Sequence, residues 1–214
     1  MLPIYVVSMK NSVERRESIS SQLRFMGLDF CFFDAINGYE VPSSLQKDVD
    51  NSQATAIWGK PLTPGEIGCA LSHIEIYKKM VKENIPRCII IEDDARLHIH
   101  FRRIIENIIS HNHSDIVFLH HGKAKKWPFS KPLPEGYHLA NYIKPSKQSK
   151  RAIFSTAAYM ITLRGANTLI KHGIPVRMPA DFLSGRPQLH HLRCSGVEPC
   201  CVDSGWFDTT IYGR

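Results

Sequence analysis

The chain opens with the pattern of a β-α-β unit, and this feature constrains its fold most. Residues 3–8 (Pro-Ile-Tyr-Val-Val-Ser) predict a strand, residues 13–26 a helix capped by Asn11 or Ser12, and residues 28–33 a second strand. Such a unit joins parallel strands through a right-handed crossover. The sequence therefore predicts an α/β fold with a mostly parallel, Rossmann-like sheet, in which ligands bind at the carboxyl ends of the strands.

Three consecutive acids follow another predicted strand. Residues 87–95 read Arg-Cys-Ile-Ile-Ile-Glu-Asp-Asp-Ala, so a β-branched run leads directly into Glu92, Asp93 and Asp94. Side chains alternate along a strand, which places Glu92 and Asp94 on one side and Asp93 on the other. Two carboxylates on one side suit Mg²⁺ or Mn²⁺ carrying a substrate phosphate. The alternative is an acidic loop that caps the next helix.

The clearest helix start lies at Thr63. A threonine N-cap, a proline at the first helical position and Glu66 three residues after the cap predict a capping box. Gly65 and Gly68 keep the first turns thin, so the free N–H groups of this helix could receive a diphosphate. Glycines also permit close packing against a neighbouring strand, and the sequence leaves both interpretations open.

The α/β alternation continues between two expected loops. The further predicted helices and strands are residues 101–110, 115–119, 152–161 and 164–172. Residues 39–60 and 122–151 lack periodicity and are expected to be long loops, the first with a short helix near residues 44–50. Residues 185–214 are expected to be irregular.

Composition narrows the class of protein. A chain of 214 residues with 43% hydrophobic content predicts one domain over residues 1–214. We expect neither a membrane span nor a secretory leader, because no apolar run or leader pattern occurs. Six scattered cysteines indicate reduced, cytosolic thiols. An excess of 27 Lys and Arg over 20 Asp and Glu favours phosphate-bearing partners or an anionic membrane surface.

Other sites have less support. No dinucleotide or P-loop glycine motif occurs. Nucleic acid is not expected, since the basic residues cluster in Pro- and Gly-rich segments without a stacking-aromatic or zinc-finger pattern. His111, His113, His120 and His121 do not form a helical i, i+4 pair around an acid, so they are expected to be solvated loop histidines rather than zinc ligands.

Six blocks, in order, resemble glycosyltransferase family 25, the lipooligosaccharide galactosyltransferases. Together they span roughly Ile4 to Leu183, and the third block is long enough to be specific by itself. The blocks are residues 4–8, 14–16, 62–73 (Leu-Thr-Pro-Gly-Glu-Ile-Gly-Cys-Ala-Leu-Ser-His), 89–95, and the pair 155–159 with 179–183.

The resemblance implies one nucleotide-diphospho-sugar transferase domain of the GT-A type. It implies inverting transfer from UDP-galactose to a sugar of bacterial lipooligosaccharide, with Mn²⁺ or Mg²⁺ at Glu92, Asp93 and Asp94. Glu92 stands where the family's strict motif has Asp, which leaves open whether it contacts the metal. The residues expected beside the donor are Arg15 or Arg16, Thr63, Gly65, Glu66, Gly68, Ser72 and His73.

The chemistry assigns further roles. A metal held by Asp94 would neutralise the departing diphosphate, and inverting displacement needs a carboxylate base on the opposite face. Asp181, which matches the acid of the family's later Pro-x-Asp segment, is the candidate base, with Asp208 in reserve. An N-cap role for Asp181 is the structural alternative. Glu66 is expected to be used by its capping box.

Three alternatives remain open from the sequence. UDP-glucose or UDP-N-acetylglucosamine could replace UDP-galactose, because one hydroxyl configuration separates the first from galactose. A binding-only protein with the same fold, or a polyanion-binding protein, would need no turnover. Within the transferase hypothesis, the basic segments predict a cytoplasmic enzyme that contacts the inner face of the membrane peripherally.

Overall fold

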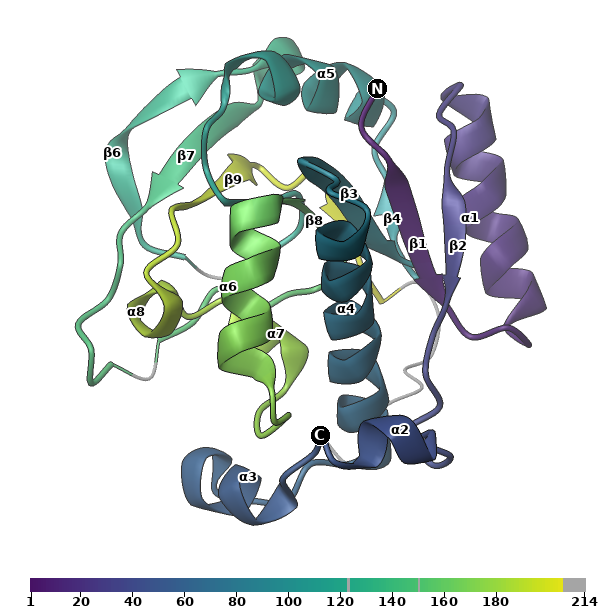
Figure 1. Cartoon of the computed structure of the whole chain (residues 1–214). Helices are drawn as coiled ribbons and strands as arrows, with labels where there is room; N and C mark the ends of the chain where they lie inside the picture. Colours follow the sequence, from purple (N-terminus) through teal and green to yellow (C-terminus); the bar gives the residue numbers. More distant parts are fainter. Residues whose placement is uncertain (123, 150, 206–214) are drawn as a thin grey trace.

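The central feature of the fold is an eight-stranded mixed sheet between two layers of helices (Figure 1). The computed structural model describes residues 1–122, 124–149 and 151–205, apart from the side chain of Trp58. The strand order is β2-β1-β3-β8-β5-β9-β7-β6. These strands are β1 (Ile4–Ser8), β2 (Cys31–Asp34), β3 (Arg87–Glu92), β5 (Ile116–Phe118), β6 (Lys126–Pro132), β7 (His138–Tyr142), β8 (Ala158–Thr162) and β9 (Cys194–Glu198).

Most strands of the sheet run in one direction, as the sequence predicts. β1 pairs in parallel with both β2 and β3, and β5 pairs in parallel with β9. Only β8, inserted between β3 and β5, and β7, between β9 and β6, run against the others. The mixed α/β fold and the N-terminal β-α-β unit are therefore confirmed, with two antiparallel strands that the sequence pattern did not reveal.

Alternate side chains of the strands supply two separate cores. α4 (Pro64–Lys82), α6 (Leu163–Gly173) and α7 (Ala180–Ser184) cover one face of the sheet, where Tyr5 and Val7 are buried. α1 (Val13–Phe25) and α5 (Phe101–His111) cover the other face, where Ile4 and Val6 are buried. Because both faces are covered, the central strands read as continuous apolar runs, which is typical of parallel sheets.

The prediction of a long loop over residues 39–60 with one short helix near residues 44–50 is only partly correct. The short helix is α2 (Ser43–Gln46), and a second helix, α3 (Asn51–Trp58), was not predicted. Asp50 caps α3 by accepting a hydrogen bond from the Gln53 N–H at 2.9 Å. Both helices are short and largely exposed, so they lack the apolar stripe from which helices are predicted.

The long loop expected over residues 122–151 is wrong. Residues 126–142 of this segment form β6, the short 3-10 helix η1 (Pro134–Gly136) and β7, an antiparallel hairpin at the edge of the sheet. Every residue of β6 is exposed, so the strand carries no alternating pattern. Pro128 and Pro132 are compatible with an edge strand, where an N–H can be missing without breaking a ladder.

The described part of the C-terminal region is more ordered than predicted. It contains α8 (Pro187–His190), the sheet strand β9 and β10 (Val202–Asp203), which pairs with β4 (Arg96–Leu97). Strand β9 escaped prediction because Gly196 occupies its centre. The Tyr142 ring packs there, and a Cβ on Gly196 would lie 2.2 Å from the Tyr142 hydroxyl. The strand predicted over residues 152–161 is shorter, since β8 begins at Ala158.

The cysteines and the helix lengths complete the description of the fold. All six cysteines are free, in agreement with the predicted reduced thiols. Within residues 1–122, 124–149 and 151–205, none of the helices combines the length and apolar character that crossing a bilayer requires.

Candidate active site

A cleft with a volume of about 710 Å³ opens where the parallel strands β1 and β3 end. Val7 of β1 lies opposite Glu92 of β3, so Ser8 and the acids after β3 meet at the same edge of the sheet. The size lies within the range of about 300–1,000 Å³ that is usual for small-molecule sites. The cleft therefore occupies the position that strand polarity predicts.

The cleft gathers most, but not all, of the residues expected at the site. The predicted residues in its wall are Arg15, Gly65, Gly68, Ser72, His73, Glu92, Asp93, Asp94 and Asp181. Arg16, Thr63 and Glu66 are not among its lining residues. The reserve acid, Asp208, lies outside the described residues.

Asp93 is held by hydrogen bonds on both carboxylate oxygens. Its Oδ2 accepts from the Ser8 hydroxyl at 2.6 Å, and its Oδ1 accepts from Arg15 Nη1 at 3.0 Å. The residue is buried. Asp93 thus ties the end of β3 to the end of β1 and to α1, and it positions Arg15 in the cleft wall.

Asp94 presents a different carboxylate. Its Oδ1 is buried and has no hydrogen-bond partner in the part of the chain that the structure describes. Burial, together with the neighbouring charge of Glu92, raises the pKa of Asp94 to about 6, and the Arg15 guanidinium offsets only part of this increase. A cation in the cleft would stabilise the ionised form, so Asp94 is the acid of the three that fits a divalent metal best.

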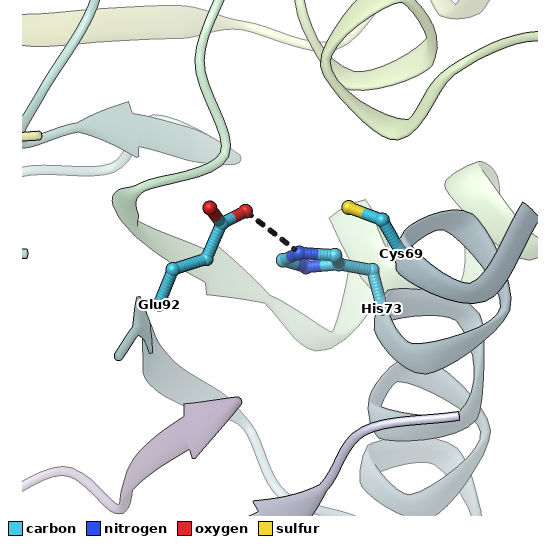
Figure 2. A group of neighbouring side chains, drawn as sticks. All are labelled: Cys69, His73 and Glu92. Carbon is cyan, nitrogen blue, oxygen red and sulfur yellow. Dashed lines mark ion pairs between the residues drawn. The ribbon is translucent and has the colours of Figure 1, made fainter. Parts of the chain in front are cut away.

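Glu92 faces a buried chain of polar rings. Its Oε1 lies 3.4 Å from His73 Nε2. Figure 2 marks this ion pair with a dashed line. The other ring nitrogen of His73 lies 2.7 Å from the Tyr159 hydroxyl, which is 2.6 Å from the Tyr77 hydroxyl. His73, Tyr77 and Tyr159 are almost completely buried. These contacts fix the His73 ring, because Tyr159 and Tyr77 are themselves held in the core.

The start of α4 forms a wall of the cleft. Thr63 and Glu66 make the predicted capping box, with the Thr63 N–H donating to Glu66 Oε2 at 2.8 Å. The capping role predicted for Glu66 is confirmed. Ser72 donates to Gly68 O at 2.6 Å and accepts from the Ile36 N–H at 2.8 Å, so it fixes the loop after β2.

Gly68 allows α4 to pack closely against the loop after β2. A Cβ at this position would lie 2.4 Å from the Ile36 carbonyl oxygen. Of the two interpretations open from the sequence, packing is therefore observed, although the neighbour is the loop after β2 rather than a strand. Gly65 still lines the cleft at the first turn of α4, where the partial positive charge of the helix N-terminus favours an anion.

The two N-terminal arginines have separate environments. Arg15 lines the cleft and pairs with Asp93. Arg16 forms an ion pair with Asp34, donates to the Ser8 and Met9 carbonyls, and lies 4.5 Å from the centre of the Phe32 ring. Arg16 therefore joins α1 to the ends of β1 and β2, and Arg15 is the arginine that a ligand in the cleft can reach.

Asp181 enters the cleft from α7. The N-cap of this helix is Pro179, and Asp181 lies in its first turn, so the N-cap alternative for Asp181 is wrong. Glu92 ends the central strand β3 and Asp93 and Asp94 follow it, whereas Asp181 comes from a helix almost ninety residues later. The fold thus supplies acids to one cleft from two directions.

His120 is a cleft residue that the sequence analysis missed. Its Nδ1 lies 2.7 Å from the Ser155 hydroxyl and its Nε2 lies 3.2 Å from the Ser204 hydroxyl. Burial lowers its pKa, and the neighbouring His121 lowers it further. No local pattern marks His120, because its place depends on the pairing of β5 with β8.

The expectation of solvated histidines holds for two of four. His111 and His113 are exposed. His121 is partly buried with an enclosed side chain, and its ring nitrogens lie 2.6 Å from Gly122 O and 3.2 Å from Val197 O. The expectation is therefore wrong for His120 and His121, which follow β5 directly and are enclosed by its neighbours in the sheet.

The fold and the cleft define an α/β domain with an acidic, small-molecule-sized site at the ends of parallel strands. Residues 1–184 match the sequence profile described as "Glycosyltransferase family 25 (LPS biosynthesis protein)". This match covers most of the chain. The protein belongs to glycosyltransferase family 25.

Relatives within the family differ in their stated activity. The chain is 26% identical to procollagen galactosyltransferase 1-A of Xenopus laevis over 83% of this chain and 30% of that protein. It is 28% identical to "probable inactive glycosyltransferase 25 family member 3" of Rattus norvegicus over 78% of this chain and 29% of that protein. The matched part thus spans less than a third of the length of these curated relatives.

A solved structure also shows a distant similarity. It is a glycosyltransferase involved in the glycosylation of the major capsid of PBCV-1, with a TM-score of 0.38 and 9% identity. The superposition covers 80% of this chain and 66% of that chain.

Proposed function

We propose that the protein is an inverting, metal-assisted glycosyltransferase that moves galactose from UDP-galactose to a sugar hydroxyl of bacterial lipooligosaccharide. The observation that carries this proposal is that Asp94 and Asp181, which come from different elements, line one cleft at the ends of β1 and β3. A cation site and a separate carboxylate are the two parts that an inverting transfer of this kind needs.

The donor diphosphate is assigned to the part of the cleft between Asp94 and the start of α4. Asp94 would hold Mn²⁺ or Mg²⁺, which supplies charge neutralisation to the departing diphosphate. Asp93 contributes by holding Arg15, since both of its oxygens are already hydrogen bonded. The N-terminus of α4 adds the partial positive charge of its helix dipole, which favours an anion.

Asp181 is the proposed base. It lines the cleft, is partly buried and belongs to an element other than the proposed metal ligands. A carboxylate in this position can take the proton of the acceptor hydroxyl as the sugar is transferred. The role is tested separately from that of Asp94.

The proposed identities of the donor sugar and of the acceptor are based on family membership. A relative named as a galactosyltransferase supports galactose, and the family description as an LPS biosynthesis protein supports a lipooligosaccharide acceptor. The exposed lysines of the β6–β7 hairpin and the net charge of +7 suit phosphorylated acceptors at the inner face of the cytoplasmic membrane.

The experiment is donor consumption by the purified protein with UDP-galactose, UDP-glucose and UDP-N-acetylglucosamine, with and without Mn²⁺. We expect consumption of UDP-galactose that a chelator abolishes. Asp94→Ala should lower kcat by about 100-fold or more, and Asp181→Asn by about 100-fold to 10,000-fold. The exposed Asp29→Asn is the matched control. Activity that resists the chelator would refute the metal role, and full activity of Asp181→Asn would refute the base.

A binding-only protein is the second candidate, because several relatives are named inactive. This candidate predicts that UDP-galactose binds, in a manner that Asp94→Ala weakens, while no UDP is released from any donor at any metal concentration. Calorimetry on the same protein samples separates the two candidates.

A further inference from the structure

We infer that Cys69, His73 and Glu92 form a site for Zn²⁺ or a similar thiolate-binding transition metal, separate from the hard cation proposed at Asp94. Each residue offers one ligand atom, and the three atoms lie within 4.8 Å of one another. Figure 2 shows the three side chains projecting into one space, Cys69 and His73 from α4 and Glu92 from the end of β3. This site does not depend on the proposed transferase activity.

The helix places two of the ligands. Cys69 and His73 are four residues apart in α4, so they lie on one face of the helix. The third ligand, Glu92, is brought opposite them because the strand and the helix pack in the same core. Cys69 and Glu92 are partly exposed and line the cleft, so an ion could enter from it.

His73 Nε2 points to a cation. It is buried, lies 3.4 Å from Glu92 Oε1 and makes no hydrogen bond within the described residues. When His73 Nδ1–H donates to the Tyr159 hydroxyl, Nε2 presents a lone pair to a carboxylate. In this tautomer the imidazole lone pair and the Glu92 carboxylate face each other as two acceptors, and a metal ion bound by both would satisfy them.

The spacing suits a tetrahedral ion. Zinc bonds of about 2.0–2.1 Å to nitrogen and oxygen place these ligand atoms about 3.3 Å apart, and the longer bond to sulfur gives about 3.6 Å. The observed 3.4 Å between His73 and Glu92 matches the first value. Rotation of the Cys69 side chain, which is only partly buried, can adjust the other separations.

A hydrogen-bonded partner holds the His73 ligand. Histidines that bind metals usually donate their second ring N–H to a neighbouring group, which fixes the tautomer and the ring. Tyr159, itself bonded to Tyr77, provides this contact at 2.7 Å.

Ligand chemistry selects the metal. Thiolate and imidazole favour zinc over Mg²⁺ or Mn²⁺, which prefer oxygen ligands. Three protein ligands leave a fourth position, which faces the cleft and can take water or a ligand oxygen, as in catalytic zinc sites.

Titration of the metal-free protein with Co²⁺ tests the site, since cobalt in a tetrahedral thiolate site has a visible spectrum and a sulfur-to-cobalt charge-transfer band. We expect one equivalent to produce both, and Zn²⁺ to abolish them. Cys69→Ser should lose the charge-transfer band, whereas Cys31→Ser, at an exposed thiol, should keep it. Tyr159→Phe should raise the Kd by about 10-fold to 100-fold.

Two further measurements keep the result unambiguous. Asp94→Asn should leave the cobalt spectrum unchanged, which separates this site from the one proposed for the donor. Zinc should protect Cys69 of the unmodified protein from alkylation, which does not depend on the folding of a variant. Absence of the charge-transfer band, its persistence in Cys69→Ser, or equal alkylation with and without zinc would overturn the inference. Since no donor or acceptor is present, failure of the transferase proposal would leave these outcomes unchanged.

Discussion

The two neighbouring acids Asp93 and Asp94 differ in how the protein stabilises their carboxylates. Asp93 and Asp94 are neighbours in sequence, yet one is hydrogen bonded on both oxygens and the other keeps a buried oxygen without a described partner. The strand alternation expected for the three acids is wrong, because β3 ends at Glu92, Asp93 and Asp94 lie in the turn that follows, and all three line the same cleft. The sequence could not reveal the partners of Asp93, because Ser8 and Arg15 lie 85 and 78 residues away in the chain.

His190 gives a prediction at this scale. Burial holds its pKa at about 4, below the ordinary 6.5. Its ring is satisfied as the neutral form, with Nε2 bonded to Ser184 O and Nδ1 accepting from the Leu192 N–H, both at 3.1 Å. The unfolded chain therefore binds more protons between these pH values, so stability is complete above pH 6.5 and falls as the pH drops toward 4.

We expect His190 to account for a loss of about 3 kcal/mol in the free energy of unfolding between neutral pH and pH 4. Urea unfolding across this range, compared with His190→Asn, measures the contribution, because the variant lacks the titrating group. His138→Asn, at an exposed histidine, is the control. Parallel stability curves for the wild type and His190→Asn would contradict the prediction.

At the scale of elements, the cleft wall depends on α4 packing against the loop after β2. Gly68→Ala would place a Cβ 2.4 Å from the Ile36 carbonyl oxygen, so the loop must shift. We expect a loss of about 1–3 kcal/mol in stability and a higher KM for the nucleotide-sugar donor, measured by thermal unfolding and steady-state kinetics. Gly122→Ala, where the nearest described atom is 3.4 Å away, should change neither.

The elements that sequence analysis found are those whose own residues carry a pattern. The capping box of α4 and the apolar runs of β1 and β3 are local signals, and the structure contains all three. The β6–β7 hairpin and β9 depend on partners instead. β6 is exposed along its length, and the glycine of β9 makes sense only beneath the Tyr142 ring.

The hairpin offers a prediction about the acceptor. Lys125 and Lys131 are exposed on or beside β6. If the acceptor is anionic or lies at an anionic surface, Lys125→Glu with Lys131→Glu should raise its KM by about fivefold per lysine at low ionic strength and weaken the salt dependence. The double variant Lys47→Glu with Lys82→Glu carries the same net charge change on other exposed residues. Equal kinetics in both double variants would remove the hairpin from acceptor binding.

At the scale of the whole molecule, the sheet is continuous from β2 to β6, although β8 reverses direction in its middle. The strands of this sheet come from distant parts of the sequence, which explains why the site could be predicted only in part. Residues 92–94 and the start of α4 are close in the chain, whereas Asp181 and His120 reach the cleft through strand pairings that span much of it. Family resemblance identified Asp181, and no local signal identified His120.

The buried Asp115 tests whether this sheet unfolds as one domain. Its Oδ1 accepts from Arg164 Nε at 2.8 Å and its Oδ2 from the Arg193 N–H at 2.8 Å, so it joins β5 to α6 and to the approach of β9. Asp115→Ala should cost about 2–3 kcal/mol and lower Tm by roughly 5–10 °C. The exposed Asp29→Ala should change Tm little.

The single-domain prediction also determines which strands should exchange their amide hydrogens faster in Asp115→Ala. If one cooperative unit spans the sheet, amide hydrogen exchange should accelerate equally in the most protected residues of β1 and of β9, because both exchange through the same global unfolding. Far-UV circular dichroism should then show one transition. Acceleration confined to β5 and β9, with β1 unchanged, would mean that the two ends of the sheet unfold separately.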